Sequence, residues 1–334
     1  MNQPMYVFGP KSMTWTLFYL PSNGGLMSLS KVNGIKFRAP QNGDNIKWWG
    51  KELSMLAHRA MLEEVRLTPK PGLVDCNNNG SHNDMDLQMF IHSANIISEN
   101  LADFLYLGYL HGNMSASQML HSLRSTGLVC EQAMYQATNG VNTHKGAIFA
   151  FGLLCAGAGR LLASNVMPDA YRLCQEVANI CHGMVVRELA STHVANSVGE
   201  RIYKSHGLAG ARGAAESGFA IVLNYSLPAY YTAIKQYWGT ERALHQALLT
   251  LIAHNEDTNL VSRGGINGLR FAQNEAKALL NEGGMAHPEA IEKISALDHI
   301  FINKNLSPGG SADLLAVTWF LANLPEGSPQ MTGQ

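Results

Sequence analysis

Apolar residues in most of the chain recur at the spacing of one helix face. Beyond Trp48, long stretches rich in Ala, Leu, Met and Glu carry this spacing, and runs of alternating β-branched residues are few. The pattern predicts helices at about residues 48–66, 86–111, 115–138, 144–164, 168–190, 211–225, 239–255, 267–283, 288–302 and 309–324. We therefore expect an all-α fold, a single multi-helix globular domain with functional loops at helix starts.

The first residues of the chain do not share this pattern. Residues 1 to about 45 are rich in Gly, Pro, Ser and Asn and show neither helix nor strand periodicity. After residue 47 no linker is long enough to require a second domain, and no internal repeat is visible. We expect a poorly structured or accessory N-terminal extension at 1–46, a helical domain at 47–326 and a C-terminal tail at 327–334.

The composition and net charge of the chain exclude several kinds of binding partner. The 334 residues have a formal net charge of −1, so no global field attracts nucleic acid or an anionic membrane. The most apolar run, Ala147 to Gly159, is shorter than the about 20 residues that cross a bilayer. The five cysteines have no zinc spacing, and the N-terminus lacks the order of a secretory signal. We expect a cytoplasmic protein with reduced thiols that binds neither nucleic acid nor membrane.

Unusual residues gather between the predicted helices. In the segment T-P-K-P-G at 68–72, two prolines stiffen the backbone around Lys70. This segment either presents Lys70 to a ligand or ends a helix and leaves the lysine in solvent. The next segment, G-S-H-N-D-M-D at 80–86, holds His82, Asp84 and Asp86. Asp84 can be the N-cap of the following helix, or the carboxylates can form a Mg²⁺ site or an acid/base pair.

A helix start and two arginine segments indicate anion sites. The segment N-T-H-K-G at 142–146 has Thr143 as the expected cap, with His144 and Lys145 in the first turn. Free N–H groups and the helix dipole favour an anion there. Two arginines, Arg212 and Arg263, stand beside glycines that let a phosphate approach the backbone. Either arginine alone can also be a surface ion-pair partner.

The last predicted helix starts in the segment S-P-G-G-S-A-D at 307–313. Ser307 is the expected cap, the glycine pair at 309–310 leaves room for a ligand, and Asp313 lies about one turn inside. The same segment can be a tight helix entrance whose aspartate favours the helix dipole. Together the segments supply cations and carboxylates that suit a Mg-nucleotide. The sequence holds no Walker A motif and no G-x-G-x-x-G after a strand, which disfavours the usual phosphate-binding α/β folds.

Six ordered segments resemble one family. They are T-P-K-P-G-L-V-D (68–75), G-S-H-N-D-M-D (80–86), N-T-H-K-G (142–146), A-R-G-x-x-x-S-G-F (211–219), D-T-N-L-x-x-R-G-G (257–265) and S-P-G-G-S-A-D-L-L-A (307–316). In this order they resemble the triphosphoribosyl-dephospho-CoA synthase family, which serves citrate lyase and has a close relative that serves malonate decarboxylase. Residues 1–45 lie outside the resemblance.

The resemblance implies an all-helical transferase that uses ATP and 3'-dephospho-CoA. The ribose 2'-hydroxyl of dephospho-CoA would attack the anomeric carbon of ATP, adenine would depart, and a separate prosthetic-group transferase would pass the product to an acyl carrier subunit. Mg²⁺ is expected with the ATP. We assign catalysis to Asp84, Asp86, Asp257 and His144, and metal binding to Asp84, Asp86 and Asp257. We assign ATP and phosphate binding to Lys70, Thr143, Lys145, Arg212, Arg263, Gly264, Ser307, Gly309, Gly310 and Asp313.

One position departs from the family pattern. Members carry a glutamate directly after A-R-G, where this chain has Ala214. Glu216 lies two residues on and could replace that glutamate only in a non-helical backbone, because positions i and i+2 of a helix point to different faces. The sequence leaves open the same reaction for malonate decarboxylase, a nucleoside-diphosphate glycohydrolase and a catalytically inactive nucleotide- or CoA-binding protein.

Overall fold

The computed structural model describes residues 4–7, 16–19, 43–190 and 197–325, and the chain divides into one unit over 1–43 and another over 44–334. In the first unit, β1 (Pro4–Val7) and β2 (Thr16–Tyr19) form an antiparallel pair with Pro4 opposite Tyr19. The units separate three residues before the predicted boundary. Most of the predicted extension and the whole predicted tail at 327–334 lie outside the described residues.

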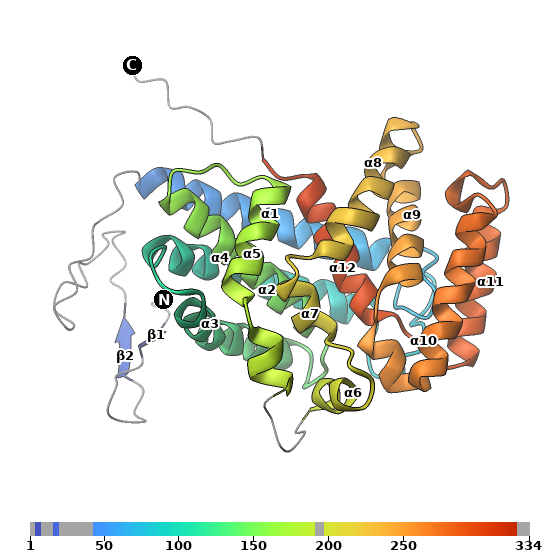
Figure 1. The fold of residues 1–334 in the computed structure, drawn as a ribbon, viewed down its shortest axis with the longest axis horizontal. Helices are drawn as coiled ribbons and strands as arrows, with labels where there is room; N and C mark the ends of the chain where they lie inside the picture. Colours follow the sequence, from blue (N-terminus) through green and yellow to red (C-terminus); the bar gives the residue numbers. More distant parts are fainter. Residues whose placement is uncertain (1–3, 8–15, 20–42, 191–196, 326–334) are drawn as a thin grey trace. The chain divides into compact units, whose positions relative to one another are not determined.

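All regular secondary structure in the described residues of the second unit is helical, which confirms the all-α prediction (Figure 1). Its helices are α1 (Gly43–Arg66), α2 (Leu87–Leu110), α3 (Ala116–Ala137), α4 (Lys145–Ala163), α5 (Ala170–Cys181), α6 (Val198–His206), α7 (Gly210–Glu216), α8 (Leu227–Lys235), α9 (Gly239–His254), α10 (Thr258–Asn281), α11 (Ala290–Asn303) and α12 (Gly309–Ala322). Shorter turns are the π-helical η1 (Val186–Ala190) and η2 (Val222–Ser226) and the 3₁₀ turn η3 (Gly284–Ala286).

Several predicted helix boundaries are wrong. The predicted helix at 168–190 is split into α5 and η1, and the one at 211–225 into α7 and η2, while α6 and α8 are missing from the prediction. Helix α10 begins at Thr258, so the segment 257–268 is not a loop. Its glycines favoured a loop because glycine lowers helix stability. In the structure only Gly265 leaves helical geometry, with φ 63° and ψ −170°, and the helix continues across that kink.

Helix α4 forms the centre of the core. Nearly every residue from Ala147 to Gly159 is buried, and the helix packs against α2, α3, α5 and α12. Glycines permit the close approach to α2, since a Cβ on Gly159 would lie 2.1 Å from the Leu105 carbonyl oxygen. Among the described helices α4 alone is long and apolar enough to cross a membrane, and 67% of its apolar window is buried inside the fold. Its apolar character is therefore that of a core helix.

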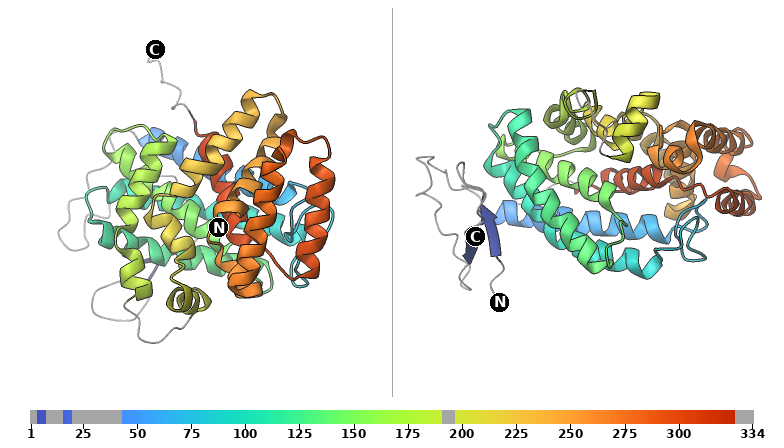
Figure 2. Two further views of the ribbon diagram at one scale, coloured as in Figure 1. Left: turned by 45° about the vertical axis from the view of Figure 1, so that its right-hand side comes forward. Right: turned by 90° about the horizontal axis from the view of Figure 1, so that it is seen from below.

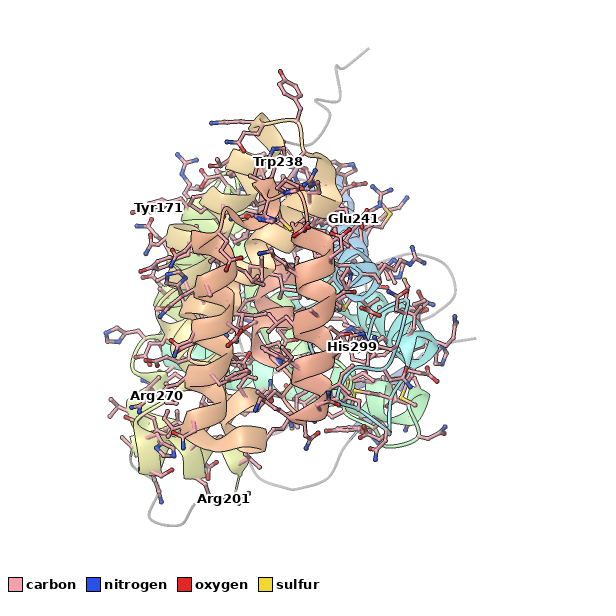
Figure 3. All side chains as sticks on the ribbon, turned by 90° about the vertical axis from the view of Figure 1, so that its right-hand side faces the viewer. Tyr171, Arg201, Trp238, Glu241, Arg270 and His299 are labelled. Atoms are coloured by element: carbon pink, nitrogen blue, oxygen red, sulfur yellow. The ribbon has the colours of Figure 1, made fainter. Side chains whose placement is uncertain are left out.

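Helix α12 links two groups of helices. It contacts α4 on one side and α8 and α9 on the other, so it lies between the α2–α4 pair and the α8–α9–α10 group (Figures 1 and 2). Helices α10 and α11 run side by side at the edge of the second group, where Arg270 and His299 are exposed (Figure 3). The starts of α4, α10 and α12 come together, with the end of α1, around one cavity.

Candidate active site

One cavity of about 480 Å³ collects most of the predicted site residues, and this volume lies in the range of small-molecule sites. Its walls come from the end of α1, the 70–90 segment, and the starts of α4, α7, α10 and α12. The predicted residues that line it are Lys70, Asp84, Thr143, His144, Lys145, Asp257, Arg263, Ser307, Gly309, Gly310 and Asp313. Segments far apart in the chain are therefore brought into one site.

Three predicted residues do not line the cavity. Asp86 is the N-cap of α2 and accepts a hydrogen bond from the Met89 N–H at 2.8 Å. Arg212 donates from Nε to Glu188 Oε2 at 2.8 Å. Gly264 faces Leu306, whose Cδ2 would lie 2.5 Å from an added Cβ. The expected cap at Asp84 is wrong as well, because Asp86 holds that position.

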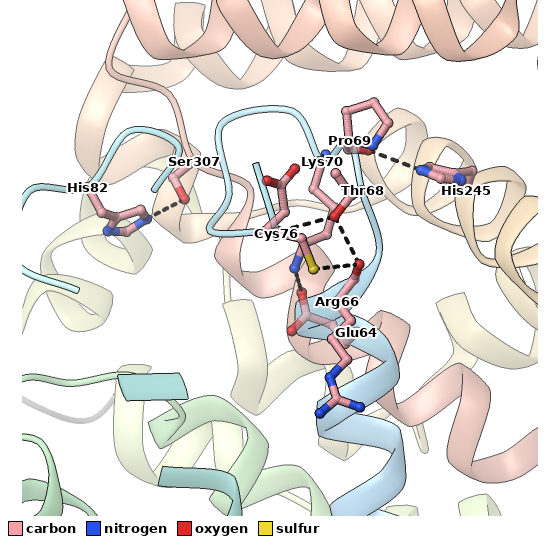
Figure 4. A network of polar contacts seen from close by, with 10 residues as sticks. Glu64, Arg66, Thr68, Pro69, Lys70, Cys76, His82, His245 and Ser307 are labelled. Atoms are coloured by element: carbon pink, nitrogen blue, oxygen red, sulfur yellow. Dashed lines mark hydrogen bonds and ion pairs between the residues drawn. The ribbon is translucent and has the colours of Figure 1, made fainter. Parts of the chain in front are cut away.

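Lys70 lies at the floor of the cavity and forms an ion pair with Glu64 of α1 (Figure 4). Its side chain is only 1% exposed, so the interpretation of Lys70 as a solvated lysine is wrong. The Lys70 N–H donates to Asp75 Oδ2 at 2.9 Å, and His245 Nε2 lies 3.1 Å from the Pro69 carbonyl oxygen. These contacts fix the stiff segment that the two prolines predicted. Removing one partner of such a buried pair would leave the other charge buried without a counter-ion.

Sequence reasoning missed Glu64. The residue follows Glu63 near the end of a long amphipathic helix, where acidic side chains usually face solvent. The fold instead turns Glu64 inward, and its side chain is 7% exposed. The only sign of a partner for Glu64 in the sequence is Lys70, six residues later. A spacing of six residues across the end of a helix does not predict a contact.

Asp257 joins the starts of two helices. It is the N-cap of α10, and its Oδ1 accepts from the Asn259 N–H at 2.9 Å. Its Oδ2 accepts from the backbone N–H of Ser311 at 2.7 Å and from Ser311 Oγ at 2.9 Å. Burial raises the pKa of Asp257, and the Ser311 hydrogen bonds oppose that shift. The carboxylate oxygens are thus engaged within the protein.

The glycine pair at the start of α12 makes room for protein side chains. A Cβ on Gly309 would lie 2.8 Å from Asn259 Nδ2, and one on Gly310 would lie 3.1 Å from Asp257 Oδ1. The expected cap at Ser307 is wrong, because Pro308 is the N-cap and makes no side-chain hydrogen bond there. The pair permits the close approach of α10 and α12.

Asp313 of α12 faces the start of α4. A Cβ on Gly146 would lie 1.9 Å from Asp313 Oδ2, so a larger residue at position 146 would displace the Asp313 carboxyl group. Burial raises the pKa of Asp313 well above its usual range, and the charges of Glu64 and Asp257 raise it further. A hydrogen bond from the Ala147 N–H opposes this shift. Its surroundings therefore favour the protonated form of Asp313, which can donate a proton.

His144 is a buried, neutral side chain in the wall of the cavity. It is 4% exposed, and burial, with the nearby charge of Lys70, lowers its pKa to about 3. It also occupies the N-cap position of α4, so the expected cap at Thr143 is wrong. Thr143 donates from Oγ1 to Ser93 Oγ at 2.7 Å instead, and Ser93 Oγ lies 2.8 Å from His144 Nδ1.

Arg263 connects several segments at the rim of the cavity through hydrogen bonds. Its Nη1 donates to the Ser81 carbonyl and to Asn305 Oδ1, each at 2.8 Å, and its Nη2 lies 3.1 Å from His82 Nδ1. His82 Nε2 lies 2.9 Å from Ser307 Oγ (Figure 4). Burial and then the charge of Arg263 lower the pKa of His82 to about 4. Since Arg263 donates to Nδ1, the neutral ring donates from Nε2 to Ser307 and links the 80s segment to α12.

Two charged side chains at the mouth remain accessible to a ligand. Lys145 pairs with Glu131 of α3 at 2.8 Å and is 53% exposed. Asp84 is 58% exposed, and its Oδ1 lies 3.9 Å from His82 Nδ1. Behind them the N-termini of α4, α10 and α12 border the cavity. Their dipoles favour an anion in the same space.

The expected Mg²⁺ ligands do not converge. Across the described residues no group of three His, Cys, Asp or Glu side chains is placed to hold a metal ion. Asp86 caps α2, and the carboxylate oxygens of Asp257 accept hydrogen bonds from the starts of α10 and α12. The described side chains therefore do not fit a metal site made by the protein alone.

Ala214 lines the cavity, and Glu216 does not take the place of a glutamate there. Helix α7 covers both positions, so their side chains point to different faces. Glu216 accepts hydrogen bonds from the Gly183 and Val185 N–H groups, each at 2.7 Å. Its carboxylate thus supports the turn between α5 and η1.

Helix starts that surround Asp313 and a buried lysine in one cavity define an anion-binding site. Residues 50–331 match the family described as ATP:dephospho-CoA triphosphoribosyl transferase, and the chain belongs to that family. The family and the transferase class expected from the six segments are thereby confirmed.

Curated relatives match over most of their own length. The probable 2-(5''-triphosphoribosyl)-3'-dephosphocoenzyme-A synthase of Photobacterium profundum is 48% identical over 281 residues, which cover 84% of this chain and 90% of the relative. The 2-(5''-triphosphoribosyl)-3'-dephosphocoenzyme-A synthase of Klebsiella pneumoniae is 47% identical over 279 residues, covering 83% of this chain and 92% of the relative. No solved structure matches the chain.

Proposed function

We propose that this chain makes 2'-(5''-triphosphoribosyl)-3'-dephospho-CoA from ATP and 3'-dephospho-CoA and releases adenine. Membership of the triphosphoribosyl transferase family supports the reaction class. The observation that carries the assignment is Asp313, a carboxylic acid with a raised pKa that lines a cavity bordered by the N-termini of three helices. A triphosphate needs the helix starts, and a departing purine needs the acid.

The reaction exchanges one bond at the anomeric carbon. The 2'-hydroxyl oxygen of dephospho-CoA bonds to C1' of the ATP ribose while the C1'–N9 bond breaks, and the triphosphate stays on the ribose. The electron pair of the broken bond leaves with adenine, which takes a proton from an acid, and the hydroxyl proton goes to a base. By analogy with inverting glycosidases, the two groups flank the bond on opposite sides.

We assign the acid to Asp313 and the base to Asp84. The raised pKa of Asp313 favours its protonated form, whereas Asp84 is 58% exposed at the cavity mouth and lies 3.9 Å from His82. Asp257 serves as a positioning residue, because its oxygens already hold the starts of α10 and α12. The triphosphate lies against the starts of α4, α10 and α12, with Lys145 as the accessible cation.

The product then goes to a separate prosthetic-group transferase that loads an acyl carrier subunit of citrate lyase in the cytoplasm. The resemblance of the six ordered segments supports this client, and malonate decarboxylase is the alternative. Supplying the product and the transferase to each acyl carrier subunit, with mass spectrometry of the carrier, distinguishes them. Loading of the malonate decarboxylase carrier alone would reject the citrate lyase assignment.

The decisive assay is chromatographic detection of free adenine. Purified protein is incubated with ATP, Mg²⁺ and 3'-dephospho-CoA, and each component is omitted in turn. Adenine that forms only with dephospho-CoA, beside a product with the added triphosphoribosyl mass, supports the proposal. Adenine formed without dephospho-CoA would instead show a glycohydrolase. A folded, ATP-binding protein that releases none would be the inactive homologue, with Ala214 as the position to change to glutamate.

A further inference from the structure

His144 carries a polar atom that the protein itself leaves without a partner. Its Nε2 is buried, and among the described residues it makes no hydrogen bond. The ring lines the cavity, and Phe90 of α2 packs edge-on against it with the ring centroids 4.8 Å apart. Buried polar groups in native proteins are nearly always satisfied, so an exception in a cavity wall points to a ligand.

Two hydroxyl groups determine which ring nitrogen carries the proton. Thr143 Oγ1 donates to Ser93 Oγ at 2.7 Å. Ser93 can therefore direct its own proton to His144 Nδ1, 2.8 Å away. Because the ring is neutral, accepting at Nδ1 places its single proton on Nε2. The free atom is thus a donor, and it can pair only with an acceptor.

The surroundings of His144 select the acceptor. Phe90, which packs against the ring, and Phe149, one helical turn after Lys145 on α4, both line the cavity. Aromatic walls suit a flat heterocycle with lone pairs in its plane. A neutral imidazole adds no charge to the site, so it offers less to a triphosphate than the helix starts and Lys145 do.

We propose that the Nε2–H of His144 donates a hydrogen bond to a ring nitrogen of the adenine of ATP, so that His144 marks the subsite of the departing base. This inference rests on the proposed function. As the C1'–N9 bond breaks, its electron pair moves into the purine, and the hydrogen bond to the ring strengthens. His144 keeps its proton throughout, because Asp313 supplies the one that adenine takes.

Ser93 is a positioning residue in this arrangement. It touches no substrate, but its proton on Nδ1 holds the Nε2–H form of the ring. Nitrogen-15 NMR of the free protein reports the form directly, with the His144 signals assigned from the His144→Phe variant. We expect protonated Nε2 and unprotonated Nδ1 in the wild type and a mixture of both forms in Ser93→Ala. A wild-type ring protonated on Nδ1 would overturn the proposal.

Binding of purine-modified nucleotides tests the contact itself. Isothermal titration calorimetry gives Kd for ATP, 1-deaza-ATP, 3-deaza-ATP and 7-deaza-ATP, each analogue lacking one ring nitrogen. We expect one analogue to bind the wild type about 10- to 100-fold more weakly than ATP, the cost of leaving a buried donor unpaired. His144→Phe should bind ATP as weakly and should no longer distinguish that analogue. His144→Gln, which returns an amide donor, should recover part of the difference.

The controls separate a purine contact from a phosphate contact and from misfolding. His92→Phe changes an exposed histidine of the same helix that carries Ser93 and should leave all four Kd values unchanged. Thermal melting establishes that each variant is folded. The proposal fails if His144→Phe still discriminates as the wild type does. It also fails if His144→Phe raises Kd equally for all four nucleotides and for inorganic tripolyphosphate. That result would place the contact on phosphate. Because Kd is measured without catalysis, this experiment tests the contact even in a protein that releases no adenine.

Discussion

Asp313 and Asp257 lie on neighbouring helix starts, yet their surroundings give them different roles. Asp257 accepts hydrogen bonds from the starts of α10 and α12, whereas Asp313 keeps few partners beside two other carboxylates. The sequence predicted both as site residues because each lies in one of the six segments, whose cations and carboxylates together suit a Mg-nucleotide. It could not separate them, since the difference depends on burial and on contacts between helices far apart in the chain.

Replacing Asp313 removes the proposed acid. We expect Asp313→Asn to lower kcat for adenine release by about 10²- to 10⁴-fold, the usual contribution of acid catalysis. In the wild type, kcat should fall as pH rises through the raised pKa of Asp313, because the acid is then ionised. The control is Asp103→Asn, a change on α2 outside the cavity lining. If the Asp313→Asn enzyme is as fast as the control, the acid lies elsewhere.

His82 and His144 make the folded protein sensitive to acid. Their folded pKa values are about 4 and about 3, below the about 6.5 of an unfolded histidine. The unfolded chain therefore binds more protons in this window, and the free energy of unfolding falls as pH is lowered from about 6.5 toward 4. His82→Gln should flatten this dependence in urea titrations from about pH 7 to about pH 4. An unchanged slope would mean that His82 is not neutral in the fold.

At the scale of elements, helix periodicity predicted the long helices well because each buries one apolar face. It failed for α6, α8 and the start of α10, where glycines or short lengths hide the period. The starts of α4 and α12 were found from their Pro, Gly and Asn, but the capping groups were not. At the start of α12 that group is Asp257 of the α10 start, which accepts from the Ser311 N–H, and at the start of α4 Asn142 Oδ1 accepts from the Lys145 N–H.

The contact of α2 with α4 depends on glycine. We expect Gly159→Ala to lower the free energy of unfolding by about 1–3 kcal/mol, because the added methyl meets the Leu105 carbonyl and forces the helices apart. Gly127→Ala on α3 is the matched control, since nothing lies within 4 Å of its added Cβ. It should stabilise by about 0.5–1 kcal/mol through helix propensity. Equal effects in urea denaturation would contradict the close packing.

The Glu64–Lys70 pair joins α1 to the cavity floor. Lys70→Met leaves a buried carboxylate without its partner, and we expect it to lower stability by about 3–5 kcal/mol. The double variant Glu64→Leu with Lys70→Met removes both charges and should recover most of that loss. Chemical denaturation of the wild type, both single variants and the double variant gives the coupling. If Lys70→Met alone matches the wild type, the pair is not formed in solution.

For the whole molecule, a net charge of −1 leaves anion binding to local groups. Lys145 at the cavity mouth is accessible to an anion, and the Glu131 carboxylate competes with that anion for the lysine. We expect Lys145→Gln to weaken ATP binding up to about fivefold at low salt, in keeping with an exposed charge pair, and Glu131→Gln to strengthen it. Both changes should shrink as salt is added. A Lys145→Gln effect that does not respond to salt would show that the lysine acts through packing.

The position of Asp313 also orders events during synthesis of the chain. The acid lies on α12, the last described helix, and this helix also supplies the Ser311 groups that hold Asp257. A chain still on the ribosome has α4 and α10 before it has the group that completes their cavity. Under the proposed mechanism, a chain that stops before α12 lacks both the acid and the Ser311 groups that hold Asp257, so it would release no adenine from ATP.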